Sequence, residues 1–259
     1  MDEVAFNIFN NSNDNNDCDN NNDSISNNEP SIYVFGYGSL VWNPGFEYSK
    51  CITGYIRGYV RRFWQGNVTH RGTLDQPGRV VTLVEDKEGI CWGCAYKVTG
   101  DLALRYLEQR ECNLGGYMTA YTKFYPRVAT EFSGLSGEAF PVLLYIATPS
   151  NDYWMGEDSL EKIAEQISTS SGPSGHNVEY LLRLAIFMRE EIPGVHDEHL
   201  FGLEKLVREE LIKRKVCIIS VMGNQPQRIN RDLHESQRRP INFEFTTKVQ
   251  EKRLRCLNI

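Results

Sequence analysis

Short runs of apolar residues recur along residues 31–147 between polar, turn-forming stretches, which is the pattern of β-strands. The runs that carry it are rich in β-branched and aromatic residues, and Gly, Pro and Asn separate them. The predicted strands are 32–37, 51–60, 79–85, 90–98, 117–125 and 140–147. In the fifth run, Met118, Ala120, Thr122 and Phe124 share one face, so this strand has two different sides.

Helical spacing dominates later in the chain. Leu160, Ile163, Ala164 and Ile167 repeat every three or four residues behind Ser159, a residue suited to cap a helix. Further helices are predicted over 177–190 and 197–214, a short one from Asp101 to the Gly115-Gly116 pair, and a last strand over 215–222. Strands that cluster before helices predict an α+β fold.

Both ends of the chain differ from its middle. Residues 1–30 contain eleven Asn and seven acidic residues, with few large apolar ones, and this composition is typical of a disordered tail. Residues 223–259 carry eight Lys or Arg against four acids. The sequence therefore predicts three parts, namely a tail at 1–30, a folded domain at 31–214 and a basic, loosely ordered extension at 215–259.

The last four residues, beginning at Cys256, have the geometry of a prenylation box behind a basic run. Asn258 is a poor substitute for the aliphatic residue that such a box needs. Prenylation and a plain tail cysteine both stay open, and the second fits the residues better.

Composition narrows the class of protein. With 41% hydrophobic and 11% aromatic residues, no apolar run of membrane-span length and no signal-peptide pattern, we expect a soluble cytoplasmic protein without stable membrane association. The net charge is −6, and the seven acidic residues of the tail exceed it, which leaves about +1 on residues 31–259. A nearly neutral domain does not favour nucleic acid as a partner. Seven cysteines without framework spacing fit reduced thiols.

Two motifs raise the question of a metal or redox site. Cys91 and Cys94 lie in a strand-like run, where residues three apart face opposite sides, so we interpret them as packing residues. His196 and His199 open an amphipathic helix without further ligands nearby, and a solvated helix cap explains them better than a metal site.

The most informative local feature is the loop that follows the first strand. The run 32–35 breaks into Gly36-Tyr37-Gly38-Ser39, whose glycines expose backbone N–H groups able to bind a carboxylate, a phosphate or an oxyanion. The third glycine of a dinucleotide fingerprint is missing, since Val41 stands there. An anion-binding loop and a plain structural turn both remain open on spacing alone.

A carboxylate on the short helix is the candidate for acid–base chemistry. Leu104, Leu107 and Glu111 fall at helical spacing, so Glu111 extends the apolar face. Burial would raise the pKa of its carboxyl group toward neutrality, where it can move protons. The alternative is a structural ion pair, for example with Arg110, or simple exposure at the end of the helix.

A series of short segments follows in order along 31–214. They are 34–42 (VFGYGSLVW), 61–66 (RRFWQG), 70–72 (HRG), 77–83 (PGRVVTL), 106–111, 115–117 (GGY), 172–175 (GPSG) with Asn177, 179–181 and 197–200. Together they resemble the ChaC-type γ-glutamylcyclotransferases, which act on glutathione. Both tails lie outside the match, and residues 112–114 separate Glu111 from the glycine pair.

The resemblance implies a small mixed β-barrel flanked by helices, with Glu111 as catalytic acid and base and the glycine loop as the cradle of a γ-glutamyl group. It implies intramolecular cyclisation of that group to 5-oxoproline, with release of Cys-Gly and no metal or other cofactor. Arg61, Arg62, Arg71 and Arg79 are candidates to anchor the glycine carboxylate. The expected substrate-binding residues are Val34, Phe35, Gly36, Tyr37, Gly38, Ser39, Leu40, Arg71, Tyr117 and Tyr180.

Two alternatives remain. The substrate could be another γ-glutamyl-amino acid or a γ-glutamylamine, or the chain could be an inactive module that only binds γ-glutamyl groups. An intact glycine loop beside Glu111 argues against the inactive module.

Overall fold

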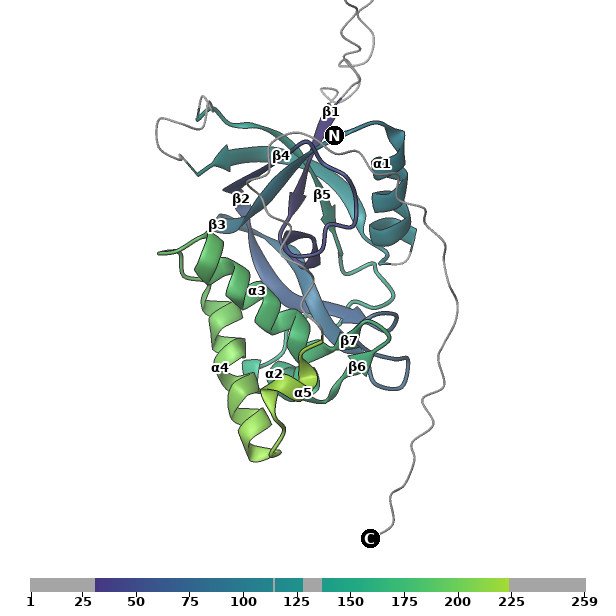
Figure 1. Ribbon diagram of the computed structural model, residues 1–259, viewed down its shortest axis with the longest axis vertical. Helices are drawn as coiled ribbons and strands as arrows, with labels where there is room; N and C mark the ends of the chain where they lie inside the picture. The colour runs from purple at the N-terminus through teal and green to yellow at the C-terminus, as the bar shows by residue number, and fades with distance from the viewer. Residues whose placement is uncertain (1–30, 114, 128–136, 224–259) are drawn as a thin grey trace, which may run out of the picture. The chain divides into compact units, whose positions relative to one another are not determined.

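Five strands form a closed barrel in the order β1-β3-β2-β4-β5 within the residues that the computed structural model describes, which are 31–113, 115–127 and 137–223 (Figure 1). The strands are β1 (Ser31–Gly36), β2 (Lys50–Asn67), β3 (Gly78–Thr99), β4 (Met118–Pro126) and β5 (Phe140–Ile146). Neighbours are antiparallel except β1 and β5, which pair in parallel through Val34 and Leu143. The mixed barrel of the α+β prediction is confirmed.

Strands β2 and β3 are longer than predicted. The runs 79–85 and 90–98 belong to one strand, and the prediction of two strands was wrong. Arg57 pairs with Ile90 but Tyr59 pairs with Glu85, so residues 86–89 form a detour opposite Gly58, whose φ is +83°. Pairing resumes on both sides of this bulge, which is why the polar, glycine-containing stretch does not end the strand. The two long strands run from the barrel toward β6 and β7 (Figure 1).

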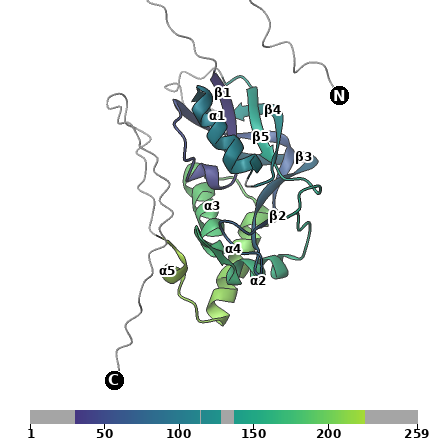
Figure 2. The ribbon, with the colours of Figure 1, turned by 90° about the vertical axis from the view of Figure 1, so that its right-hand side faces the viewer.

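The helices of the second half pack beside the barrel. They are α2 (Leu160–Thr169), α3 (Asn177–Glu191) and α4 (Glu198–Lys213), and Figures 1 and 2 show them grouped together while α1 (Asp101–Leu107) lies apart from them. The predicted cap is confirmed, because Ser159 Oγ accepts the N–H of Lys162 at 3.3 Å. A two-residue pair of strands, β6 (Ser171–Gly172) and β7 (Gly175–His176), leads into α3.

The predicted strand over 215–222 was wrong. The chain turns at Lys215, where φ is +56°, and forms the short helix α5 (Ile218–Val221). Val221 is buried, and Arg183 of α3 donates to the carbonyl of Gly223 at 3.5 Å. The segment thus lies against a helix rather than beside a strand. The tail at 1–30 and Cys256 lie outside the described residues.

The helix that begins at Asp101 changes its geometry before it ends. α1 stops at Leu107, and residues Glu108–Asn113 continue as a π-helical turn instead of the α-helix predicted up to Gly115. Leu107 is fully buried, as its spacing predicts. Arg110 and Glu111 are both largely buried, although an α-helical period would turn adjacent residues about 100° apart. Such π-turns are frequent at functional sites.

The cysteine and histidine motifs are explained by packing. Cys91 and Cys94 are both buried in β3, which confirms the packing interpretation. The histidine prediction was wrong in detail, because Asp197 caps α4 while His199 Nε2 accepts the N–H of Phe63 at 3.0 Å. Burial lowers the pKa of His199 to about 4. Within the described ranges, no three His, Cys, Asp or Glu side chains gather as a metal site would require.

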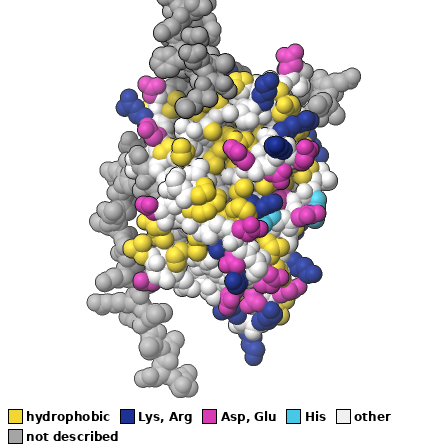
Figure 3. All heavy atoms as spheres, turned by 180° about the vertical axis from the view of Figure 1, so that it is seen from behind, with side chains coloured by type: hydrophobic (Ala, Val, Ile, Leu, Met, Phe, Trp, Pro, Cys, Tyr) yellow, Lys and Arg dark blue, Asp and Glu magenta, His cyan; other side chains and the backbone are white. Residues whose placement is uncertain are grey.

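Charges of both signs share the surface. In Figure 3, acidic and basic side chains mix at the lower end of the visible face, where α4 ends, and ion pairs such as Lys213–Glu210 and Arg214–Glu165 lie in this part of the fold. Among the described helices, none has the length and apolar character needed to cross a membrane.

Asn177 holds the edge of β3 against α3. Its buried amide accepts the N–H of Arg79 at 2.7 Å and donates to the carbonyl of Arg79 at 2.8 Å, as a neighbouring strand would. We expect Asn177→Ala to lower the free energy of unfolding by about 3 kcal/mol, because two buried backbone groups lose their partners. Urea unfolding measures this. The exposed Asn43, changed to Ala, should shift stability by no more than about 0.5 kcal/mol, and an equally small loss for Asn177→Ala would contradict this role.

Candidate active site

The glycine loop is held from inside the barrel. After β1 ends at Gly36, the chain turns into a short 3-10 helix, Ser39–Val41, closed by a hydrogen bond from Val41 N–H to the carbonyl of Gly38 at 3.1 Å. The hydroxyl of Tyr37 donates to the carbonyl of Tyr145 at 2.5 Å, and that of Tyr96 donates to the carbonyl of Leu40 at 2.9 Å. These buried bonds fix the loop.

The side chains of the predicted loop set fall into two groups. Val34, Phe35, Tyr37 and Leu40 are buried and pack in the hydrophobic core. Ser39 instead accepts a hydrogen bond on its hydroxyl oxygen, from Arg110 Nη2 at 2.8 Å. The loop therefore combines an apolar support with a polar end that faces the π-helical turn.

Gly38 is where the loop meets the rest of the site. A Cβ at this position would lie 2.7 Å from the Tyr180 hydroxyl and 2.7 Å from Val81 Cγ2. No side chain fits there without displacing one of these groups. Because Gly38 has no Cβ, the loop after β1 can pack closely against Val81 of β3 and Tyr180 of α3.

Two tyrosines flank the backbone of Val81. The hydroxyl of Tyr117 donates to the carbonyl of Val81 at 3.0 Å, while the N–H of Val81 donates to the hydroxyl of Tyr180 at 3.4 Å. Burial raises the pKa of both phenols, that of Tyr180 to about 12, so they are neutral at physiological pH. Both predicted pocket tyrosines thus lie beside the glycine loop.

Glu111 faces this cluster. Its side chain is 16% exposed, and burial raises the pKa of its carboxyl group, although the positive charge of Arg110 opposes the rise. Arg110 Nε lies 3.0 Å from Glu111 Oε1. The carboxylate in turn contributes to the raised pKa values of Tyr37, Tyr117 and Tyr180, which places it within electrostatic reach of all three. The ion pair and the buried carboxyl group, kept as alternatives above, are both present.

Arg71 lies at the edge of the cluster, beside the N-terminal end of α3. Its Nη1 donates to Glu179 Oε2 at 2.6 Å and to the carbonyl of His176 at 3.1 Å. A Cβ on Gly172 would lie 2.4 Å from the carbonyl oxygen of His70, so the turn that carries Arg71 docks tightly on β6. Two of the motif segments that are distant in sequence therefore meet in space.

The other three candidate arginines are engaged elsewhere in the fold. Arg61 is buried and pairs with Asp197 at 3.0 Å, and Arg79 is buried and donates to Gln166 Oε1 at 2.8 Å. Arg62 donates to the carbonyl of Arg61 at 2.8 Å. Arg61 and Arg71 both act electrostatically on Tyr180, and of these two Arg71 has the more exposed side chain, 12% against 1%.

Arg110 is the residue that sequence reasoning treated only as a salt-bridge partner. In the structure it forms an ion pair with Glu111 and donates a hydrogen bond to Ser39 of the glycine loop. The sequence signal that could have indicated this role was the position of Arg110 immediately before Glu111. The hydrogen-bonding roles of Asn177 and of the Val81 backbone were missed, although both residues lie in the motif segments, because hydrogen bonds to a strand edge leave no trace in hydrophobic periodicity.

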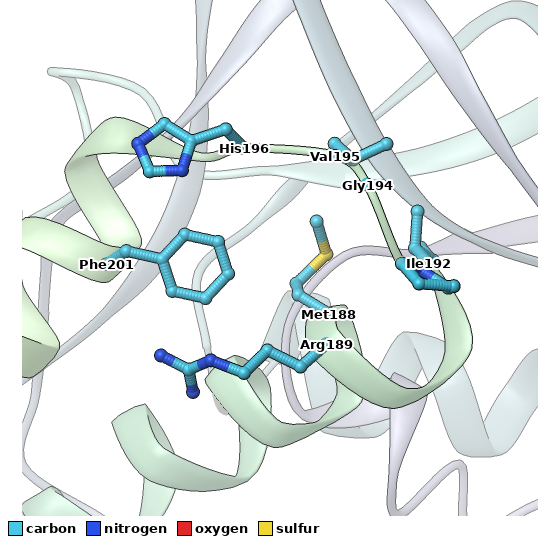
Figure 4. A pocket seen from close by; sticks show the side chains of 8 residues that line it. Met188, Arg189, Ile192, Gly194, Val195, His196 and Phe201 are labelled. Atoms are coloured by element: carbon cyan, nitrogen blue, oxygen red, sulfur yellow. The ribbon is translucent and has the colours of Figure 1, made fainter.

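A cavity of about 390 Å³ lies at the other end of α3, as the close view in Figure 4 shows. Met188, Ile192, Val195 and Phe201 contribute its apolar lining. Glu111 and the glycine loop do not take part in it, so we do not assign the reaction to this cavity.

The chain is similar to known proteins over most of its described residues. The family model described as "ChaC-like protein" matches residues 32–210. The protein named glutathione-specific gamma-glutamylcyclotransferase 1 is 50% identical in Danio rerio over 177 residues, covering 67% of this chain and 87% of that protein. Its Homo sapiens counterpart is 51% identical over 176 residues, covering 67% and 77%.

A solved structure shares the fold. The crystal structure of a gamma-glutamyl cyclotransferase specific to glutathione from yeast has a TM-score of 0.62 and 28% identity, and the match covers 69% of this chain and 96% of that one. The family match spans the barrel, the glycine loop, Glu111 and the helices through most of α4. This chain belongs to the ChaC-like family.

Proposed function

We propose that this chain is a glutathione-specific γ-glutamylcyclotransferase, an enzyme of glutathione catabolism that forms 5-oxoproline and Cys-Gly. The observation that carries the proposal is the buried carboxylate of Glu111, held 3.0 Å from Arg110 and joined through it to the glycine loop. The relatives described above, whose names state this activity, support the same reaction.

The reaction needs one base that later acts as an acid. Glu111 removes a proton from the α-ammonium group of the γ-glutamyl residue, and the neutral amine attacks the γ-carbonyl carbon of the same residue. A C–N bond of the five-membered ring forms, and the amide bond to cysteine breaks. The protonated Glu111 returns its proton to the departing amine of Cys-Gly. The ring nitrogen loses a second proton as the lactam forms, and this proton also goes to the departing amine, which leaves as an ammonium group. The atoms therefore balance without water, and the reaction is that of a carbon–nitrogen lyase.

The glycine loop supplies binding and electrostatic stabilisation. We assign the backbone N–H groups at Tyr37, Gly38 and Ser39 to the α-carboxylate of the substrate or to the oxyanion that develops on its γ-carbonyl. We assign the neutral phenols of Tyr117 and Tyr180, which bind the backbone of Val81 beside Gly38, to the same binding space. Fixing the amine near the carbonyl contributes the orientational part of the rate enhancement.

Arg71 is the proposed anchor for the glycine carboxylate of glutathione. We expect Arg71→Gln to raise KM for glutathione roughly tenfold, the range of one charged hydrogen bond, and to change kcat little. Steady-state kinetics with glutathione and with its glycine ethyl ester measure this. The wild type should favour the free acid, and the variant should lose that preference.

Arg183 provides the matched control, because it binds the same Glu179 carboxylate through Nε at 2.8 Å. Arg183→Gln should retain discrimination between glutathione and the ester. Equal loss in both variants would assign Arg71 a structural role instead.

The substrate assignment is tested against its closest alternative. Purified full-length protein is incubated with glutathione and, separately, with γ-glutamyl-alanine, and 5-oxoproline is quantified. We expect kcat/KM to favour glutathione strongly. Comparable values would favour a broader γ-glutamyl-amino-acid or γ-glutamylamine substrate range, and binding without any product would indicate an inactive module.

The expected cytoplasmic location belongs to the same proposal. The thiol of Cys91 forms no disulfide, as in a reducing compartment. We keep a small molecule as the expected partner, with no nucleic acid, no stable membrane association and no cofactor.

A further inference from the structure

Arg110 makes contacts with the chain on both sides of the site. Its Nη1 donates to the carbonyls of Asn43 and Pro44, at 2.9 Å each, and its Nη2 donates to Ser39 Oγ at 2.8 Å. Its Nε lies 3.0 Å from Glu111 Oε1. One planar guanidinium thus spans the glycine loop, the segment after it and the carboxylate.

These contacts orient two groups of the site, the Glu111 carboxylate and the Ser39 hydroxyl, at the same time. The ion pair places Nε of Arg110 beside Oε1 of Glu111, so we assign proton transfer to the second carboxylate oxygen, Oε2. Because the Ser39 oxygen accepts from Nη2, its own O–H hydrogen remains to donate to an acceptor in the substrate. The guanidinium of Arg110 therefore sets the orientation of the Glu111 carboxylate and of the Ser39 hydroxyl together.

The π-helical turn makes this arrangement possible. Glu108–Asn113 leaves α-helical geometry immediately after α1, and the side chains of Arg110 and Glu111 are only 18% and 16% exposed. The carbonyls of Glu111 and Cys112 then accept the N–H groups of Tyr117 and Gly116, at 2.9 Å each. The turn is closed by its own hydrogen bonds while two adjacent charged side chains face the loop.

We infer that Arg110 is a positioning residue for catalysis, which clamps the loop 39–44 to Glu111 and sets both the orientation and the proton affinity of the carboxylate. This inference rests on the proposed function. Arg110 itself needs no contact with substrate, since it acts through Ser39 and Glu111.

The pH dependence of the site involves a defined set of groups. Arg110 lies on the same turn as Glu111, and the other titratable groups in electrostatic contact with the carboxylate are neutral up to high pH because their pKa values are raised. They are Tyr37 after β1, Cys112 on the π-helical turn, Tyr117 before β4, Tyr145 on β5 and Tyr180 on α3. Arg110 is therefore the charged group whose removal should change the titration of Glu111 most.

The test compares Arg110→Gln, which removes the charge and the planar guanidinium, with Arg110→Lys, which keeps the positive charge but not the guanidinium. We expect kcat for glutathione to fall roughly 100-fold in Arg110→Gln, the range associated with misplacement of a catalytic group. The acid limb of its kcat–pH profile should move to higher pH, because an uncompensated buried carboxylate binds its proton more tightly. Arg110→Lys should lose kcat while its acid limb stays near that of the wild type.

An NMR titration of ¹³C-labelled glutamate carboxyl groups gives a readout without substrate. The Glu111 signal is assigned by its absence in Glu111→Gln, and its midpoint should rise in Arg110→Gln. Exposed Arg105 on α1, changed to Gln, is the control and should alter neither kcat nor the midpoint.

Each outcome decides between named alternatives. Wild-type kcat in Arg110→Gln, or a lower kcat with an unmoved limb and midpoint, overturns the inference. If Arg110→Gln does not fold, wild-type kcat in Arg110→Lys overturns it. A wild-type protein that makes no 5-oxoproline rejects the proposed function instead, and the NMR midpoints still report whether Arg110 controls the carboxylate.

Discussion

Glu111→Gln should remove nearly all turnover of glutathione while the protein stays folded. The amide has nearly the shape of the carboxylate but cannot accept the ammonium proton or return it to Cys-Gly. General acid–base catalysis by one group contributes about 10²- to 10⁴-fold, so we expect kcat to fall roughly 1,000-fold. A coupled assay for 5-oxoproline, with circular dichroism as the folding check, measures both parts.

The control for this variant is Glu108→Gln. Glu108 lies on the same π-helical turn but is exposed. It should retain wild-type activity. If Glu111→Gln were as active as Glu108→Gln, the carboxylate at 111 would not be the base, and the buried ion pair with Arg110 would be structural only.

Gly38→Ala should damage catalysis nearly as much, for a steric reason. The new methyl group would lie 2.7 Å from the Tyr180 hydroxyl and 2.7 Å from Val81 Cγ2, so the loop, the tyrosine or the strand must move. A displacement near 1 Å at a catalytic site can cost about 100-fold in rate. We expect kcat/KM for glutathione to fall by roughly this factor in steady-state assays.

Gly202→Ala is the matched control, since Gly202 lies within α4 and the added methyl would approach only Leu160 Cδ1, at 3.2 Å. Activity should be unchanged, and the helix should gain stability because alanine loses less backbone entropy than glycine. Wild-type activity in Gly38→Ala would show that close approach at the loop is not needed for the reaction.

Local patterns predicted most elements of the fold. Apolar, β-prone runs located β1 and β5, period-two alternation located β4, and the Ser159 cap located α2, because these signals depend on neighbouring residues. Residues 86–89 were misread as a strand end, since a polar stretch with glycine has the composition of a turn. Only the pairing of β3 with β2 on both sides of the bulge shows that the strand continues.

The site was predictable only in part, because only some of its residues carry a local sequence signal. Helical spacing placed Glu111 on an inward face, and the glycine run indicated an anion-binding loop. Spacing does not reveal that the last turn is π-helical, and this is what brings Arg110 to the same side. Glu111 was recognised as a candidate base, whereas the arginine that orients it became visible only in three dimensions.

The origin of the atoms in the product tests the central assignment most directly. Full-length protein is incubated with glutathione in H₂¹⁸O, and the products are quantified by mass spectrometry. Intramolecular cyclisation predicts unlabelled 5-oxoproline and Cys-Gly in equal amounts, because the attacking nucleophile is the substrate's own amine. Glutamate that carries ¹⁸O, or no cleavage of glutathione at all, would contradict the account.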